Sequence, residues 1–460
     1  MGKQTLYFLT AMAILLLLVC SCNRVNESET AVPETAVVEE PSSTPEPTIS
    51  PTTDPTSTPE PSPTTMPTAT VTVIQLATST PESETQADPE QSAELVEQGD
   101  KFLAQQDYES ALEAYNLAIE LDPENAIAYN QRGQIHFGGS PVSLGSGPTL
   151  ADFNKAIELD PEYVEARINR GRVLISIGRA EDAVEELSLA LTLDSGNAEI
   201  FYYRALAYES LDDFENAIND LDQAISLENS FFAAYNERAD IHFVLGNYEE
   251  AVLDYSRLLS LLPNFTDGYI SRGVASFQLG NIDDALRDFD TAIQLDPLNS
   301  RIYFERGQMY YALGNYHQAI DDFNFIESIG FNSTSHYIIW GWGYSELFRG
   351  LAYLELEEYH LALVDFDRAV ESGINDSEAY WGRGDAYFNL GDFEAALEDF
   401  NVALQLDGNY EIVYFSRGLT HEQLEQFAEA IADYEHYLEI GTDADLRNEA
   451  ERRLQELRDS

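Results

Sequence analysis

An arginine recurs every 34 residues along most of this chain. Self-similarity at a fixed period of this length is typical of repeat proteins, in which each unit buries its apolar side against the next unit. The sequence therefore predicts an array of stacked units, a class of protein whose usual role is binding. The recurring residues are Arg170, Arg204, Arg238, Arg272 and Arg306 and, after one interruption, Arg349, Arg383 and Arg417.

Each repeat has the pattern of two helices joined by a tight turn. Between the two apolar segments a Leu-Gly step recurs, for example at Leu313-Gly314, and glycine readily adopts the left-handed conformation that ends a helix. A Leu-Asp-Pro step closes several units, as at 295–297, because proline cannot continue a helix. Small residues alternate in register with large aromatic residues such as Phe323, which predicts close packing between units.

The residues at these repeated positions resemble the tetratricopeptide repeat (TPR), a 34-residue unit with aromatic, Leu-Gly, Ala, Phe and Pro positions in this order. The resemblance implies an all-α, right-handed superhelical solenoid of about ten helix-turn-helix TPR units that ends in a C-terminal capping helix at 445–460. The family usually has Trp where this chain has Tyr, and Leu where it has the recurring Arg. The ten expected units are 92–125, 126–163, 164–197, 198–231, 232–265, 266–299, 300–333 (followed by an insert at 334–342), 343–376, 377–410 and 411–444.

The first residues are predicted to be an export signal. Lys3 precedes an apolar run from Leu6 to Val19, which is the length of a secretory signal and short for a membrane span. The end of the run resembles the lipobox of bacterial lipoproteins, with Cys22 as the lipidated residue and 1–21 as the signal peptide. Cys20 is the poorer candidate, because Val19 is too branched for the small position before the cleavage site. An ordinary signal peptide or an uncleaved anchor is the alternative.

Residues 22–91 are predicted to be a disordered stalk. This segment is rich in Pro, Thr, Ser and Glu and has few large apolar side chains, so it cannot bury enough surface to offset the entropy of ordering. Together with the lipidated Cys22, it predicts a protein anchored by lipid in the bacterial cell envelope, on the extracytoplasmic side.

The chain is strongly acidic, with a formal net charge of −58 from 24 basic and 82 acidic residues. This charge argues against nucleic acid as a partner, because binding to phosphates depends on Lys and Arg. It favours a soluble monomer that attracts cationic partners. Both cysteines lie at the end of the signal, the seven histidines are scattered, and no phosphate loop or nucleophile elbow occurs. We therefore expect no catalytic residue, no metal site and no cofactor.

The recurring arginines require partners, because an unpaired buried charge is costly. A carboxylate follows most of them by 16 residues. In the first unit both members are absent, which favours pairing within a repeat over pairing between neighbours; arginines that line a binding groove are the alternative. The predicted structural ion pairs are Arg204 with Asp220, Arg238 with Asp254, Arg272 with Asp288, Arg306 with Asp322, Arg383 with Asp399 and Arg417 with Asp433, and the same spacing joins Arg349 to Asp365 and Arg170 to Glu186.

The first helix of each unit is expected to line the concave side of the solenoid. Its exposed face is predicted to be aromatic and aliphatic with some acidic residues, and it has almost no Lys or Arg with which to grip a terminal carboxylate. A protein or peptide segment with apolar anchors and basic charge fits this face better, although the same side chains equally suit packing between neighbouring first helices. The candidate groove residues are Asn130, Phe137, Tyr202, Asn236, Phe243, Phe277, Phe304, Gln308, Tyr311, Trp381, Phe388 and Phe415.

The insert at 334–342 interrupts the period and carries two of the three tryptophans of the chain. Tyr337, Trp340 and Trp342 form a candidate partner contact, because an exposed apolar segment marks an interaction site. Packing of the insert on the eighth unit is the alternative.

These features predict a non-catalytic protein-protein interaction scaffold, membrane-anchored on the extracytoplasmic side, that binds peptide or protein segments in the concave TPR groove. A passive acidic spacer or structural component of the envelope is one alternative. An accessory subunit of an envelope enzyme or secretion complex is another.

Overall fold

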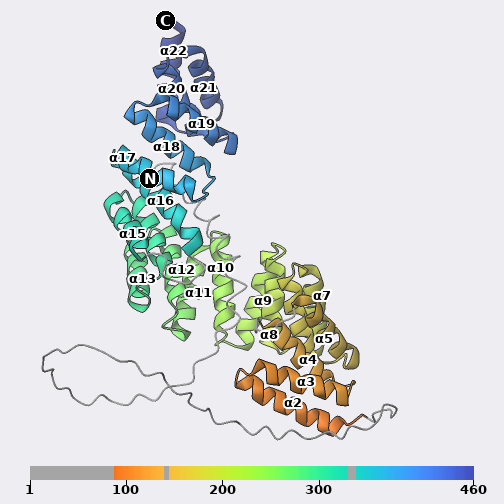
Figure 1. The fold of residues 1–460 in the computed structure, drawn as a ribbon. Coiled ribbons are helices and arrows are strands. Elements are labelled where there is room, and N and C mark those ends of the chain that lie inside the picture. Colours follow the sequence, from red (N-terminus) through yellow and green to blue (C-terminus); the bar gives the residue numbers. More distant parts are fainter. Residues whose placement is uncertain (1–86, 139–144, 330–337, 460) are drawn as a thin grey trace, which may run out of the picture. The chain divides into compact units, whose positions relative to one another are not determined.

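The computed structural model describes residues 87–138, 145–329 and 338–459, with side chains from 343 onward in the last range. Within these ranges all regular secondary structure is helical, in the 21 helices α2 to α22 (Figure 1). The all-α prediction is therefore confirmed. The contacts divide the described residues into two compact units, 87–161 and 162–459.

The unit at 87–161 contains two helix pairs, and the unit at 162–459 contains eight pairs and a final helix. In both units the two helices of a pair pack closely, and each pair then packs on the next. The helices of the first unit are α2 (Pro89–Ala104), α3 (Tyr108–Leu121), α4 (Ala126–Phe137) and α5 (Ser146–Leu159). Those of the second are α6 (Val164–Ser176), α7 (Ala180–Leu193), α8 (Ala198–Glu209), α9 (Phe214–Leu227), α10 (Phe232–Val244), α11 (Tyr248–Leu261), α12 (Thr266–Gln278), α13 (Ile282–Leu295), α14 (Ser300–Ala312), α15 (Tyr316–Ile329), α16 (Ile338–Glu355), α17 (Tyr359–Glu371), α18 (Ser377–Leu390), α19 (Phe393–Leu406), α20 (Glu411–Gln423), α21 (Phe427–Ile440) and α22 (Ala444–Asp459).

Two helices begin before the repeat boundaries expected from the sequence. The first starts at Pro89 instead of residue 92, because the Asp88 side chain caps it by accepting a hydrogen bond from the Gln91 amide, and proline suits the first turn. The eighth unit starts at Ile338 instead of residue 343, so part of the insert extends α16. The insert contains no proline that would prevent this extension.

In the pairs whose turn is fully described, the turn depends on one residue with a positive φ angle. Gly246, Gly280 and Gly314 have φ angles between 73° and 79°, as the Leu-Gly steps predict. Where the sequence has no glycine, other residues adopt the same conformation with φ angles between 57° and 60°, which the Leu-Gly signal did not reveal. These residues are Gln106, Asp212, Glu357 and Glu425.

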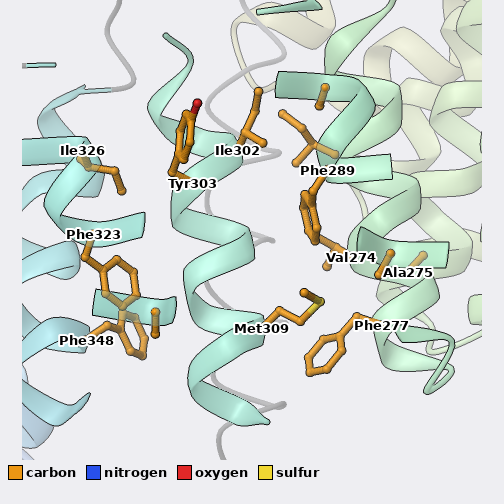
Figure 2. Close-up of a cluster of buried hydrophobic side chains, with 14 of the residues drawn as sticks. Val274, Ala275, Phe277, Phe289, Ile302, Tyr303, Met309, Phe323, Ile326 and Phe348 are labelled. Carbon is orange, nitrogen blue, oxygen red and sulfur yellow. The ribbon is translucent and has the colours of Figure 1, made fainter. Parts of the chain in front are cut away.

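Aromatic rings of the second helices fill the space next to glycines of the first helices. Phe366 is fully buried, and a Cβ atom added to Gly382 of the next pair would lie 2.4 Å from its ring. Figure 2 shows aromatic rings on both sides of α14, with Phe289 on one side of the helix and Phe323 on the other. At most of these glycines the ring belongs to the same pair: a Cβ atom added to Gly307 would lie 2.8 Å from the ring of Phe323. Any side chain there would collide with a ring, so the two helices of a pair are held at a short distance from each other, and Gly382 does the same between two successive pairs.

Candidate interaction surface

The twelve candidate groove residues lie on the first helices, but none of them is fully exposed. Asn130, Phe243, Phe277, Gln308 and Phe415 are buried. The other seven, Phe137, Tyr202, Asn236, Phe304, Tyr311, Trp381 and Phe388, are half-buried. The face they form is therefore partly used for packing, and their individual contacts separate two groups.

The first group packs on the following pair. The ring of Phe304 lies 5.9 Å from that of Phe348 on α16. Trp381 lies 6.2 Å from the ring of Tyr410, and its indole N–H donates to Ser416 Oγ at 3.3 Å. Tyr202 packs in the same way, 5.1 Å from Phe231, which precedes α10. These side chains link successive first helices.

The second group packs across the turn within its own pair. The ring centroids of Phe243 and Tyr248 are 5.2 Å apart, those of Tyr311 and Tyr316 5.5 Å, and those of Phe388 and Phe393 5.5 Å. Each pair of rings joins the end of a first helix to the start of a second helix. Tyr311 also contacts the following pair, since its ring lies 6.4 Å from that of Phe348 on α16. Trimming Phe243 or Phe388 should disturb its own hairpin more than the stacking of neighbours.

The recurring arginines lie against the carboxylates of their own units. The six predicted pairs, and Arg349 with Asp365, each form two parallel hydrogen bonds from Nε and Nη2 to the two carboxylate oxygens, at 2.6 to 2.9 Å. Arg170 differs, because Glu186 is shared between it, at 3.1 Å, and Arg167, at 2.6 Å. Arg132 bonds to Asp152, 20 residues later, across the longer turn of its unit.

The third guanidinium nitrogen of Arg132 and of seven recurring arginines reaches the preceding helix pair, a contact that the sequence analysis missed. Nη1 of Arg306 lies 3.4 Å from Asp290, and Nη1 of Arg383 lies 2.9 Å from Asp367. Pairing within a repeat and pairing between neighbours are therefore not alternatives, because the planar guanidinium has donors on two sides. The signal is a polar residue two positions after the carboxylate of the preceding unit, or after Ala114 in the first unit, which has no carboxylate there. Its other instances are Asn116 for Arg132, Ser188 for Arg204, Asp222 for Arg238, Ser256 for Arg272, Asn324 for Arg349 and Asn401 for Arg417.

At the repeat position where the family usually has tryptophan, this chain has tyrosine, and these tyrosine rings stack on the recurring arginines. The Arg306 guanidinium lies 5.6 Å from the ring of Tyr303, one helical turn earlier, and Arg383 lies 5.5 Å from Tyr380. Stacking of this kind stabilises a guanidinium and leaves its in-plane donors free to bond. The two departures from the family pattern, Arg for Leu and Tyr for Trp, thus belong to one structural unit.

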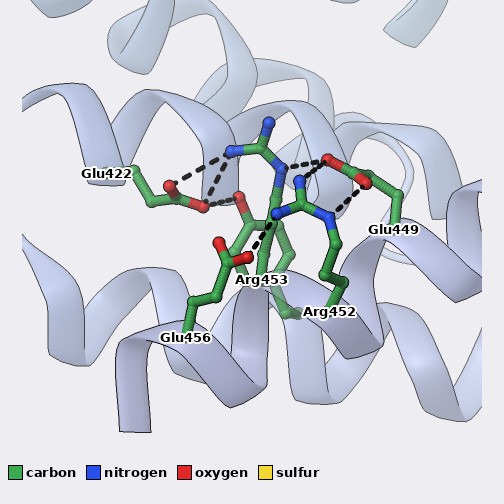
Figure 3. Close-up of polar contacts among 6 residues, drawn as sticks. Glu422, Glu449, Arg452, Arg453 and Glu456 are labelled. Carbon is green, nitrogen blue, oxygen red and sulfur yellow. Dashed lines mark hydrogen bonds and ion pairs between the residues drawn. The ribbon is translucent and has the colours of Figure 1, made fainter. Parts of the chain in front are cut away.

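The final helix α22 closes the array with arginines of its own. Arg453 bonds to Glu422 of α20 at 3.1 Å and to Glu449 at 2.7 Å, and Arg452 pairs with Glu449 and Glu456 (Figure 3). Arg458 pairs with Glu435, which occupies the position that receives an arginine of the next unit elsewhere in the chain. In this way α22 takes the place of a following repeat.

Acidic side chains on the first-helix face of α18 are held in an unfavourable environment. Burial raises the pKa of Glu378 to about 7, with a smaller effect from Asp376. Burial and the charge of Glu355 raise the pKa of Asp385 to about 6. On α16, burial raises the pKa of Glu346 to about 7. These carboxylates contrast with the arginine-paired ones on the second helices.

Several predicted sites lie outside the described residues. Cys22 and the stalk at 22–91, apart from its last five residues, are not described, and neither is Tyr337. Trp340 and Trp342 lie in the helical backbone of α16, but their side chains are not described. In the described ranges, no three His, Cys, Asp or Glu side chains are arranged to hold a metal ion. No helix there is long and apolar enough to span a membrane.

Helix pairs stacked in sequence, with glycines facing aromatic rings and a helix covering the last pair, define a helical repeat protein. Family models match it: a TPR repeat model at 99–138 and 384–425, and tetratricopeptide repeat models at 150–198, 202–264, 271–324 and 412–440. The chain belongs to the tetratricopeptide repeat family. Proteins of this family are generally non-catalytic scaffolds for protein-protein interaction, and their repeats bind proteins or peptides.

Solved structures resemble the chain as well. MamA is 28% identical over 33% of this chain and 89% of its own, with a TM-score of 0.32. A tetratricopeptide repeat protein from Parabacteroides merdae ATCC 43184 is 22% identical over 58% of this chain and 99% of its own, with a TM-score of 0.41. The Cut9 and Hcn1 hetero-tetramer of the APC/C is 14% identical over 73% of this chain and 77% of its own, with a TM-score of 0.45. A search of curated proteins found no match.

Proposed function

We propose that this protein is a non-catalytic interaction scaffold that binds a protein or peptide segment along the first-helix face of its repeats. The observation that carries the proposal is the chemistry of that face. Half-buried aromatic side chains, Tyr202, Phe304, Trp381 and Phe388 among them, alternate with carboxylates, while the arginines of the same helices are bonded to second helices. Aromatic side chains supply much of the energy at interfaces, so a segment with apolar anchors and basic charge is the best-matched partner.

Selection of peptides from a random library on the full chain tests this function. We expect selected peptides to lose at least about tenfold in affinity on Phe388→Ala, because truncating an aromatic hot-spot residue costs about 2 kcal/mol or more. Phe388 is the suitable position, since its described ring contact, Phe393, belongs to its own pair. Binding would be measured by fluorescence anisotropy, and helicity by circular dichroism.

The matched control is Leu253→Ala on α11, a second helix. Leu253 is 69% exposed, so its removal changes apolar surface without disturbing a core. Loss of binding on Leu253→Ala with retention on Phe388→Ala would refute the proposed face. No selectable peptide, on a folded protein, would favour the passive acidic spacer.

We also propose that the scaffold is lipid-anchored at Cys22 on the extracytoplasmic side of a bacterial envelope. The support is the sequence alone: an apolar run, a small residue before the cysteine, and a long Pro- and Thr-rich segment after it. Several acyl chains on the lipidated cysteine would hold the protein at the membrane more firmly than one acyl chain can.

Replacing Cys22 by Ala should move most of the protein from the membrane fraction to the soluble fraction of bacterial cells, and should abolish incorporation of labelled fatty acid. Cys20→Ala, two residues away, is the control and should change neither result. Unchanged fractionation and labelling of Cys22→Ala would contradict lipidation at this residue.

A further inference from the structure

The first-helix face of α18 carries carboxylates and aromatic rings in one stripe. Glu378, Trp381, Asp385 and Phe388 follow one another at spacings of three and four residues, which places them on one side of a helix. Glu378 and Asp385 are seven residues apart, or about 10 Å along the axis at 1.5 Å per residue. The indole of Trp381 lies between them along the stripe.

Groups from neighbouring elements frame this stripe. Burial raises the pKa of Tyr311, at the end of α14, and that of Tyr410, just before α20, and the charge of Glu378 adds to both effects. The charge of Glu355 on α16 acts on both Tyr311 and Asp385, and Glu355 itself accepts a hydrogen bond from Tyr316 at 2.9 Å. The ring of Tyr311 lies 5.5 Å from that of Tyr316, and Tyr410 lies 6.2 Å from Trp381, so rings of neighbouring elements stand beside the acidic side chains of α16 and α18.

The carboxylates of this location have no positive partner among the described residues. Neither Glu378 nor Asp385 forms an ion pair there, whereas Asp399, on the second helix of the same pair, accepts two hydrogen bonds from Arg383. Glu378 faces Asp376, Tyr311 and Tyr410, and Asp385 faces Glu355 and Asn389, so every charged neighbour has the same sign. A recessed carboxylate without a counter-ion is costly, and an external cation would remove that cost.

We propose that this stripe receives two basic side chains of an extended segment of a partner protein, one at Glu378 and one at Asp385. The ammonium or guanidinium of one of these two side chains lies against the ring of Trp381. The inference rests on the proposed function and specifies its partner. An extended or polyproline-II chain advances about 3.1 to 3.4 Å per residue, so the two basic residues stand three apart. Because the two positions are about 10 Å apart along the helix axis, each carboxylate can receive its own basic side chain.

Binding of designed peptides to the full chain tests this inference. The probe is a fluorescein-labelled Ala-Leu-Pro-Lys-Ala-Pro-Lys-Leu-Ala, and the comparison peptide has Gln at both Lys positions. We expect the Lys peptide to bind at least about tenfold more tightly at pH 8, and to lose that advantage on Glu378→Gln/Asp385→Asn. At pH 5.5 the advantage should shrink, because Glu378 is then largely protonated.

The matched control is Glu394→Gln/Glu398→Gln, which removes two exposed acidic charges from the adjacent helix α19. This control should change the affinity for the Lys peptide by less than about twofold. Its two charges are exposed, and salt screens their long-range attraction for the peptide. If the Lys and Gln peptides bind equally, and the α18 variant binds both unchanged, the scaffold function stands and this inference is wrong. If neither peptide binds and library selection also fails, the proposed function fails and this inference fails with it.

Discussion

Replacing Arg349 by Met is expected to lower the free energy of unfolding around α15 to α17 by about 3 to 5 kcal/mol, because it leaves a buried carboxylate without its partner. Arg349 and Asp365 are 4% and 3% exposed and share two hydrogen bonds, and Arg349 also bonds to Glu327 of α15 at 2.6 Å. The guanidinium thus joins three helices. Hydrogen exchange is the suitable measurement, because long repeat arrays often unfold in parts.

Two further variants test whether the effect of Arg349→Met comes from the buried ion pair. Arg287→Met removes an arginine that is 74% exposed and paired on the surface with Asp284, so it should cost less than about 1 kcal/mol. Arg349→Met/Asp365→Leu should regain much of the lost protection, because two apolar side chains can replace a buried pair. Equal effects of Arg349→Met and Arg287→Met would show that the recurring arginines add little to stability.

Raising the pH from 5 to 8 is expected to destabilise the protein. The pKa values of Glu378 and Glu346 are raised from 4.5 to about 7, and that of Asp385 from 3.8 to about 6. Between about pH 4.5 and 7 the folded chain therefore holds protons that the unfolded chain has released, so its stability falls as the pH rises through this window. For Glu378 the loss is at most about 3.5 kcal/mol, at about 1.4 kcal/mol per pKa unit.

Thermal melting between pH 5 and 8 would test this dependence. Glu378→Gln/Asp385→Asn should flatten the profile and raise the melting temperature at pH 8, because the amides carry no charge to desolvate. Glu394→Gln/Glu398→Gln should keep the slope of the parent chain and so separates local burial from the net charge of −58. Arginine lowers the pKa of some carboxylates, such as Glu327. These groups make the protein less stable as the pH falls below about 4.5, which is outside the range of this test. A profile that rises toward pH 8 would contradict the prediction.

The repeat period made much of the fold predictable. Leu-Gly steps marked turns because glycine tolerates a positive φ angle, and Gly246, Gly280 and Gly314 have one. The same rule missed Glu357 and Glu425, where the surrounding helices impose the conformation on residues that do not favour it. Likewise, the capping Asp88 was overlooked because it lies outside the periodic pattern, within the acidic, proline-containing end of the stalk.

The candidate surface was less predictable from the sequence. Aromatic side chains suit both packing between helices and binding of a partner, so residue type does not distinguish the two roles. Phe304 and Phe388 look alike in the sequence, yet one packs on the next pair and the other on its own hairpin. The environment of Glu378 was also hidden, because its pKa is raised mainly by burial, which depends on how neighbouring helices pack.

The sequence by itself determined the helical repeat, the turn positions and the carboxylate partner of each recurring arginine, since these depend on spacings of a few residues to one repeat. Only the tertiary structure decided which neighbour each guanidinium also reaches, which aromatic side chains are used in packing, and which carboxylates are left without a cation. These depend on how far successive helix pairs turn and approach one another, a geometry set by the sum of many side-chain contacts and not by any single motif.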